Sequence, residues 1–347
     1  MTAHPFRDDS EPRLSSKLAF LREPRNYPDA PAQVEAIETH FSWVFLTERH
    51  AYKLKKPVFE PMIDWRTLAA RHRNCDEETR VNRRFAPDVY LGVVALVRDD
   101  AGDLRLEGEG RAVEWLVKMR RLPAAVMLDR LIVEGGFDAA RLAPVVDLLC
   151  RVYAGSPAPM PPAAYLDHLA QIIETSSAEL TRPEFGLGSA LIAELAAAQR
   201  ELIQSRWAAF EARAARVVEG HGDLRPEHVC LIEPPRVIDS LEFARVLRLV
   251  DPVDELGFLA LECERLGAPA ARATIFAEYT RASGHSLCAW LIDFYQSVRA
   301  GVRARLAMRH LLEPNPRDPE RWPRLARRYL ELATSHVAAA GTRGDRS

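Results

Sequence analysis

The stretch His221-Gly222-Asp223-Leu224-Arg225-Pro226-Glu227-His228, followed by Val237-Ile238-Asp239, decides the fold class of this chain. It places one aspartate in a tight His-Gly-Asp turn and a second at the end of a short apolar run. Kinases that transfer the γ-phosphoryl group of ATP need two such carboxylates: one orients the attacking hydroxyl group, and the other holds the metal that bridges the phosphates. The pattern therefore predicts Asp223 as the catalytic carboxylate and Asp239 as a metal ligand.

Each residue of this motif also has a plainer interpretation. Asp223 could simply cap a loop, and Asp239 could be an ordinary turn residue after a strand. The spacing of the two aspartates favours the catalytic interpretation. His221 is placed with the catalytic residues, and we expect it to fix the loop by hydrogen bonding rather than to transfer a proton. Gly222 allows the tight backbone path that the turn needs.

A lysine-rich strand upstream supplies candidates for phosphate binding. Lys53 is expected to bind the α- and β-phosphates, with a helix glutamate holding it in place, as in protein kinases. Side chains alternate along a strand, so Lys55 shares its face and is the alternative, although a solvated strand edge would show the same residues. The expected helix partner is Glu78, with Glu77 as the alternative, because neighbouring helical residues point about 100° apart.

The nucleotide contacts are harder to derive from residue types. The first strands carry no Gly-rich loop, so the Ser42 hydroxyl, with neighbouring backbone N–H groups and Thr39, is the candidate for covering the phosphates. Met119 and Arg120 end a predicted strand where the two lobes should join, and a backbone hinge there is expected to contact the adenine edge. The sequence contains no Gly-x-x-x-x-Gly-Lys-[Ser/Thr] motif, which excludes a Walker-type kinase on this chain.

The hydrophobic pattern divides the chain into three parts. Residues 1–30 are expected to form a mobile N-terminal arm, with one short docking helix at 18–21 as the alternative. Residues 31–120 predict a nucleotide-binding lobe, and residues 121–340 predict a helical lobe with the catalytic loop and the acceptor site. The expected strands of the first lobe are 43–46, 51–54, 89–97, 104–107 and 112–119, with a helix at 64–85 capped by Asp64. The expected helices of the second lobe are 124–132, 138–153, 163–180, 187–218, 252–266, 269–283, 287–312 and 318–340, the last capped by Asp318, with short strands at 229–231 and 237–238.

The central loop resembles that of the phosphotransferase family typified by aminoglycoside and choline kinases, which carries His-Gly-Asp-x-x-x-x-Asn and a later metal-binding Asp. The resemblance extends over residues 30–310 to bacterial aminoglycoside-phosphotransferase-like proteins often fused to a Walker-type kinase domain, which is expected to be missing here. It implies an α+β, bilobal protein-kinase-like fold with a small mixed sheet lobe and a larger, mainly helical lobe. ATP would bind in the cleft, and the helical lobe would bind the acceptor. The matching stretches include Tyr52-Lys-Leu-Lys-Lys-Pro-Val58, Glu78-Thr-Arg-Val-Asn-Arg-Arg84 and Asp251-Pro-Val-Asp-Glu-Leu256.

His228 departs from the family, which has Asn at this position. An imidazole suits softer ions than Mg²⁺. Three outcomes are open. The metal could be held by Asp239 with Glu242, the metal preference could change with His228 as a ligand, or the protein could have become a binding module.

Composition restricts the class of partner. The chain has 47 Lys and Arg residues against 49 Asp and Glu residues. This near-balance gives no electrostatic argument for a nucleic-acid-binding surface. The five cysteines are scattered and are expected to be reduced thiols of a cytoplasmic protein. No apolar stretch approaches the roughly 20 residues that span a bilayer, so no membrane partner is expected. Nothing in the sequence selects an oligomeric state.

The leading hypothesis is an ATP-dependent phosphotransferase acting on a hydroxyl of an unidentified small molecule, with Mg²⁺, or Mn²⁺ as the alternative, as the metal. A set of acids would suit a cationic acceptor, although an ordinary charged helix face would look the same. The second hypothesis is a catalytically weak pseudokinase that binds nucleotide and acts as a sensor or partner-binding module. A structural protein that binds no nucleotide ranks third. The acids that would suit a cationic acceptor in the leading hypothesis are Glu242, Asp254, Glu255, Glu262 and Glu264.

Overall fold

The structure, a computed structural model, describes residues 12–313, 316 and 318–342. The chain divides into two compact units. The first comprises Met1–Ala124 and Val237–Arg245, and the second comprises Ala125–Arg236 and Val246–Ser347. The first division lies close to the boundary expected at residue 120. The sequence did not predict that the segment carrying Asp239 belongs to the first unit.

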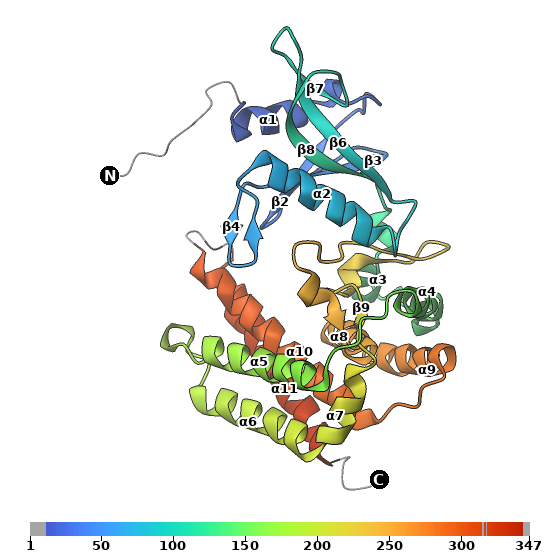
Figure 1. The fold of residues 1–347 in the computed structure, drawn as a ribbon, viewed down its shortest axis with the longest axis vertical. Helices are drawn as coiled ribbons and strands as arrows, with labels where there is room; N and C mark the ends of the chain where they lie inside the picture. Colours follow the sequence, from blue (N-terminus) through green and yellow to red (C-terminus); the bar gives the residue numbers. More distant parts are fainter. Residues whose placement is uncertain (1–11, 314–315, 317, 343–347) are drawn as a thin grey trace. The chain divides into compact units, whose positions relative to one another are not determined.

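The first unit is built on a six-stranded sheet, with α2 (Leu68–Asn82) packed along two of its strands, β6 and β8 (Figure 1). The strand pairs of this sheet are antiparallel, whereas the expectation was a mixed sheet. Each strand predicted for the first lobe is present, and a further edge strand, β1, was not predicted. In spatial order the strands are β1 (Glu35–Glu38), β2 (Ser42–Leu46), β3 (His50–Lys55), β8 (Arg111–Arg120), β6 (Tyr90–Arg98) and β7 (Leu104–Leu106).

Alternation along β3 assigns its side chains to two different cores. Tyr52 and Leu54 are fully buried in a cluster that also contains Leu21. Ala51 belongs to the other cluster, with Cys75 of α2. Because side chains on a strand alternate between faces, Lys53 shares the face of Ala51. The face of the sheet that packs against α2 therefore receives the lysines.

The expected mobile arm is wrong for residues 12–30. Helix α1 (Leu14–Leu21) packs on the sheet, and Leu21 is fully buried. Lys17 Nζ donates hydrogen bonds to the Val113 carbonyl oxygen at 2.6 Å and to Glu114 Oε2 at 2.9 Å, and both Lys17 and Glu114 are buried. The apolar side chains of α1 and this ion pair fix the segment. Residues 1–11 of the expected arm lie outside the described residues.

Helix α2 begins later than the sequence predicted. Asp64 lies in the short strand β5 (Ile63–Asp64), which pairs with β4 (Phe59–Glu60), and its carboxylate binds Arg66. Thr67 is the N-cap, and its Oγ1 accepts a hydrogen bond from the Ala70 backbone N–H at 3.2 Å. Both residue types cap helices well, so the tertiary pairing of β5 decided between them.

The second unit is mainly helical, as predicted. The expected helix at 187–218 is two helices, and the last helix begins at Arg321 rather than 318, because Asp318 has a left-handed backbone with φ 48°. Helices α10 and α11 pack along each other (Figure 1). Tyr295 of α10 and Tyr329 of α11 are fully buried. The helices are α3 (Leu128–Val133), α4 (Ala143–Ala154), α5 (Pro162–Leu180), α6 (Ser189–Ser205), α7 (Trp207–Ala214), α8 (Pro252–Arg265), α9 (Ala271–Ser283), α10 (Ala289–Arg309) and α11 (Arg321–Thr342).

Four short strands accompany these helices. Strands β9 (Val218–Glu219) and β12 (Leu249–Val250) form an antiparallel pair that leads into the His-Gly-Asp loop. Strands β10 (Val229–Cys230) and β11 (Arg236–Val237) lie at the positions that the sequence predicted. Among the described residues, no helix is both long enough and apolar enough to cross a membrane.

Candidate functional site

Two lysines and three carboxylates meet in the first unit, and we call them the lysine cluster: Lys53, Lys55, Glu78, Asp239 and Glu242. Lys53 Nζ donates to Glu78 Oε1 at 2.8 Å and to Asp239 Oδ1 at 2.6 Å. Lys55 forms ion pairs with Glu78 and Glu242. The structure thus brings together both candidate lysines, the preferred glutamate and the predicted metal ligand.

The orientation of α2 decides between the two glutamates. Glu78 is fully buried and faces the sheet, whereas Glu77 points elsewhere and binds Arg80 at 2.7 Å. The lysines differ mainly in exposure. Lys55 is 1% exposed and Lys53 is 14% exposed, while the Asp239 side chain is 46% exposed. Of the two lysines, Lys53 is therefore the one that a ligand can reach, together with Asp239.

Three contacts fix the backbone around Asp239. Its N–H donates to the Tyr90 hydroxyl at 3.0 Å. The next residue, Ser240, donates its N–H to Asn82 Oδ1 at 2.8 Å, and Asn82 Nδ2 donates to the Glu78 carbonyl oxygen at 2.9 Å. Asp239 has φ 62°, a left-handed conformation that is uncommon for residues other than glycine. Such strained residues persist where the surroundings hold them, and they are frequent at functional sites.

The cluster keeps Lys53 and Glu78 charged despite their burial. Burial alone would lower the pKa of Lys53, but Asp239 and Glu78 outweigh it and hold that pKa well above its usual value. Burial alone would raise the pKa of Glu78, but Lys53 and Lys55 bring it below its usual value. Burial dominates at Glu242, whose pKa is raised although Lys55 opposes the shift. Lys53 is thus a permanent cation beside an ionised glutamate, as phosphate binding requires.

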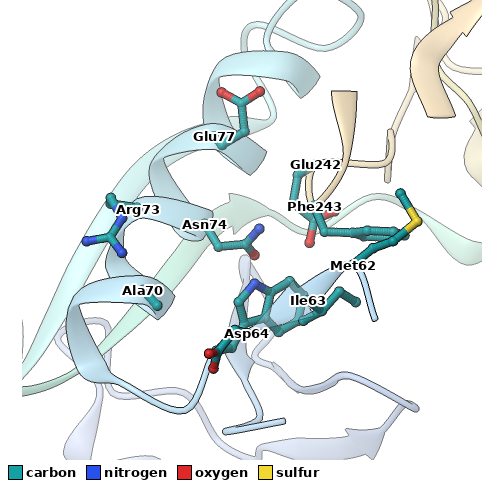
Figure 2. Close-up of a pocket in the computed structure, with 10 residues that line it drawn as sticks. Met62, Ile63, Asp64, Ala70, Arg73, Asn74, Glu77, Glu242 and Phe243 are labelled. Carbon is teal, nitrogen blue, oxygen red and sulfur yellow. The ribbon is translucent and has the colours of Figure 1, made fainter. Parts of the chain in front are cut away.

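A pocket of about 280 Å³ lies beside the cluster in the same unit. Figure 2 shows Glu242 and Phe243 on one side of it, opposite Asn74 and Glu77 of α2. Ile63 of β5 also lines it (Figure 2). Glu242 therefore faces the pocket while it neutralises Lys55, which gives it a structural role that its position after Asp239 did not reveal.

The remaining nucleotide candidates lie within the sheet. Ser42 is 1% exposed, and its N–H donates a hydrogen bond to the Thr39 hydroxyl oxygen at 3.0 Å. Met119 is in register with Ala51, and the Arg120 N–H donates to the Val89 carbonyl oxygen at 2.8 Å. That N–H is thus bonded within the sheet, and a nucleotide contact from another atom of Arg120 stays a prediction. A nucleotide contact from Ser42 or Met119 stays a prediction.

In the second unit, the Glu255 side chain binds the backbone of the His-Gly-Asp loop. Its carboxylate accepts the N–H groups of His221 at 2.8 Å and Gly222 at 2.6 Å, and the Tyr153 hydroxyl at 2.7 Å. Gly222 has φ 86°, so the predicted need for glycine is confirmed. A Cβ atom on Gly220 would lie 2.5 Å from Glu255 Oε2, so this close approach also requires glycine. From the sequence, Glu255 is considered only as an acid that could bind a cationic acceptor. Its position in the first turn of α8 is the feature that could have indicated its role in holding the loop.

The loop presents Asp223 between two histidines. His221 is fully buried, and its Nδ1 accepts the Asp223 N–H at 3.3 Å, which fits the expected loop-fixing role. His228 Nδ1 donates to the Asp223 carbonyl oxygen at 2.8 Å. Arg225 Nε lies 3.5 Å from Asp223 Oδ2. Burial alone would raise the pKa of Asp223, but Arg225, His228 and Arg303 bring it below its usual value, so the carboxylate is ionised.

The acids considered for a cationic acceptor are already paired inside their own units. Glu242 binds Lys55, and Glu255 binds the loop backbone. Asp254 accepts two hydrogen bonds from Arg299, at 2.7 and 2.6 Å. Glu262 binds Arg265, Arg303 and the Tyr329 hydroxyl, and Glu264 lies 2.9 Å from His336 Nε2. This set of acids therefore stabilises the fold.

Three comparisons place this architecture among known proteins. No protein-family model matches the chain. Uncharacterized proteins of Mycobacterium tuberculosis and Mycobacterium bovis are 30% identical over 322 residues, which is 89% of this chain but only 62% of theirs. A choline/ethanolamine kinase family protein from Mesorhizobium loti aligns over 95% of this chain and 100% of its own, with a TM-score of 0.53 and 15% identity.

The chain has a choline-kinase-like fold. A glucosamine kinase solved with glucosamine, ADP and inorganic phosphate supports the same conclusion, with a TM-score of 0.50 and 14% identity over 89% of this chain and 82% of its own. The predicted α+β, protein-kinase-like class, with a sheet lobe and a helical lobe, is confirmed. At sequence identities this low, the structural similarity establishes the fold alone. The reaction has to be argued from the residues of this chain.

Proposed function

We propose that this chain is an ATP-dependent phosphotransferase that acts on a hydroxyl group of a small molecule. The observation that carries the proposal is Lys53, a strand lysine held by the buried helix residue Glu78 and by Asp239. Protein kinases use a lysine on this strand, paired with a helix glutamate, to bind the nucleotide phosphates. The resemblance to kinases of small molecules, including those fused to a Walker-type domain, supports the same assignment.

In the proposed reaction, Asp223 orients the acceptor hydroxyl. The transition state of phosphoryl transfer is loose, so positioning contributes more than basicity. An ionised Asp223 is suited to that task, because it accepts the hydroxyl hydrogen bond without needing a raised pKa. Glu255 and His221 act as positioning residues, since they fix the loop backbone that carries Asp223.

A magnesium ion would be held by Asp239, with most of its other ligands supplied by nucleotide phosphates and water. Mg²⁺ commonly takes one or two carboxylates in kinase sites rather than a complete protein cage. Among the described residues, no group of three or more His, Cys, Asp or Glu side chains is arranged to hold a metal. When bound, the ion would neutralise charge on the phosphates. We further propose that the protein works in the cytoplasm.

ATP with Mg²⁺ is expected to stabilise the purified chain. At one hundred times the dissociation constant, ligand binding adds about 2.7 kcal/mol to the free energy of unfolding, which raises the melting temperature by several degrees. Differential scanning fluorimetry with ATP, GTP and each metal measures this. Lys53→Met should abolish the shift, and Lys56→Met, which removes a lysine that binds Glu38 and lies on the other face, should retain it. The proposal fails at its first step if no nucleotide shifts the wild-type protein.

A nucleotide-binding pseudokinase is the second candidate, and His228 favours it. The family has Asn at this position, and here Nδ1 of the imidazole is committed to the loop carbonyl of Asp223. A protein of this kind would show the nucleotide shift but negligible transfer to any acceptor. Measuring both quantities on one preparation separates the two candidates.

The role of His228 can be tested through metal dependence. If the ring only supports the loop, the ratio of activity with Mn²⁺ to activity with Mg²⁺ should be the same in wild type and in His228→Asn. If the ring contributes a ligand, Mn²⁺ should be preferred by wild type, and the asparagine variant should shift the preference toward Mg²⁺. The hydrogen bond to Asp223 leads us to expect the first result. Metal titrations of ADP formation check it, and a reversed preference would place His228 in the metal site.

A further inference from the structure

An ion network adjoins Asp223 in the second unit, and we call it the arginine network. It contains Arg225, Arg265 and Arg303 together with Asp223, Glu227 and Glu262. Arg225 Nε lies 3.5 Å from Asp223 Oδ2 and 3.9 Å from Glu227 Oε2. Arg265 links Glu227, at 3.8 Å, to Glu262, at 2.7 Å.

Arg303 closes the network from α10. Its Nε lies 3.2 Å from Glu262 Oε1 and 3.4 Å from the Tyr329 hydroxyl, while its guanidinium stacks at 5.6 Å from the Tyr329 ring centre. These contacts fix the position of Arg303 through a buried glutamate, because Glu262 is fully buried. The network is therefore a preformed arrangement rather than a set of mobile surface side chains.

The arginines hold more hydrogen-bond donors than the network uses. A guanidinium has five N–H donors. Among the residues that the structure describes, the Arg225 guanidinium donates no hydrogen bond, although its Nε is buried, and Arg303 donates only from Nε. Both side chains are only 18–19% exposed. Charged donors on partly buried side chains that are left unbonded favour an anionic acceptor of hydrogen bonds.

The electrostatics of Asp223 and Glu227, the two partly exposed acids of the network, agree with an anionic ligand. Burial alone would raise the pKa values of Asp223 and Glu227, yet Arg225 and its neighbours bring both below their usual values. The arginines beside these two carboxylates therefore stabilise their ionised forms. Glu227 is poorly suited to bind a cationic group, because Arg225 and Arg265 already lie within 4 Å of its carboxylate oxygens.

We propose that the acceptor substrate carries an anionic group, a phosphate or a carboxylate, which Arg225 and Arg303 bind while Asp223 orients the acceptor hydroxyl. This inference rests on the proposed phosphotransfer. The acceptor oxygen forms a bond to the γ-phosphorus, and the bond from that phosphorus to the β,γ-bridging oxygen breaks. ADP leaves, and the hydroxyl proton passes to water by way of Asp223. The arginines hold the anionic group and take no part in bond making.

A matched acceptor series tests the proposal with the full chain, ATP and Mg²⁺. Glycerol 3-phosphate and glycerate are anionic, glycerol is neutral and choline is cationic. We expect kcat/KM for an anionic acceptor to exceed that for glycerol or choline by roughly 10- to 100-fold, the range of a charge-assisted hydrogen bond. Arg303→Gln should raise the acceptor KM and remove the preference, with the KM for ATP unchanged. Arg281→Gln, on an exposed arginine of α9, is the matched control and should retain the preference.

Two kinetic results would overturn the proposal. Turnover of choline or glycerol without a preference for anions would show that the arginines are structural. A raised KM for ATP in Arg225→Gln and Arg303→Gln, with the acceptor KM unchanged, would assign these side chains to the phosphates of the nucleotide instead.

A binding measurement decides the matter even if none of these acceptors is phosphorylated. Inorganic phosphate is titrated calorimetrically into the nucleotide-free chain. Binding should persist in Lys53→Met, which removes the proposed nucleotide lysine, and should be lost in Arg225→Gln and Arg303→Gln. Phosphate binding that survives both arginine substitutions, or that is absent from wild type, contradicts the proposal. Failure of the phosphotransferase function alone would appear differently, as no ATP-dependent shift with phosphate binding intact at the arginines.

Discussion

Asp223→Asn is expected to lower kcat by roughly 10²- to 10⁴-fold, the usual contribution of a positioned acid–base group. The amide is nearly the same size as the carboxylate but cannot accept the hydroxyl hydrogen bond with a negative charge. The loop backbone should keep its shape, because Glu255 and His221 hold it through main-chain N–H groups rather than through the Asp223 carboxylate. Steady-state ADP formation and the ATP-induced shift in melting temperature measure the two effects separately.

The other predicted aspartate provides an informative comparison. Asp239→Asn should weaken metal-dependent nucleotide binding as well as turnover, because its carboxylate is the proposed metal ligand and also binds Lys53. Asp167→Asn, on the exposed face of α5, is a control that should change neither quantity. Similar, mild effects of the substitutions at 223 and 239 on both quantities would show that these roles are wrongly assigned.

Glu78→Gln is expected to lower the free energy of unfolding by about 3 kcal/mol or more. Breaking a buried ion pair by removing one partner leaves an uncompensated charge, which commonly costs about 3–5 kcal/mol. Here one carboxylate serves two lysines, and both Glu78 and Lys55 are almost completely buried. Urea or thermal unfolding followed by circular dichroism measures the loss, and the same variant should also lose the ATP-induced stabilisation.

The neighbouring glutamate is the matched control for this result. Glu77→Gln changes a partly exposed side chain that pairs with the exposed Arg80, so a change within about 0.5 kcal/mol is expected. The pH dependence follows from the direction of the shift. Because the lysines hold the pKa of Glu78 below its usual value, its contribution is present above about pH 4.3 and declines as the pH falls further. Equal destabilisation by the two substitutions would contradict the assignment of Glu78.

Local patterns predicted much of this protein. Alternation along a strand placed Lys53 and Lys55 on one face, because that periodicity depends only on backbone geometry. The positive φ of Gly222 followed from the tight His-Gly-Asp turn in the same way. The Ala- and Leu-rich periodic segments predict the helical second unit. Asp64 and Asp318 are not the helix caps that their residue type predicts, because a good capping residue does not by itself fix where a helix begins.

The sequence by itself determined the two motifs, the faces of the strands and the class of fold, because each depends on the order and spacing of nearby residues. Only the tertiary structure decided which partner each charged side chain finds. The rotation of α2 selected Glu78 over Glu77, and packing brought Asp239 to Lys53 from 186 positions away in the chain. Glu255 and Arg303 reached the surroundings of Asp223 from α8 and α10 for the same reason. Such pairings are fixed by how whole elements pack, and no local pattern in the sequence encodes that.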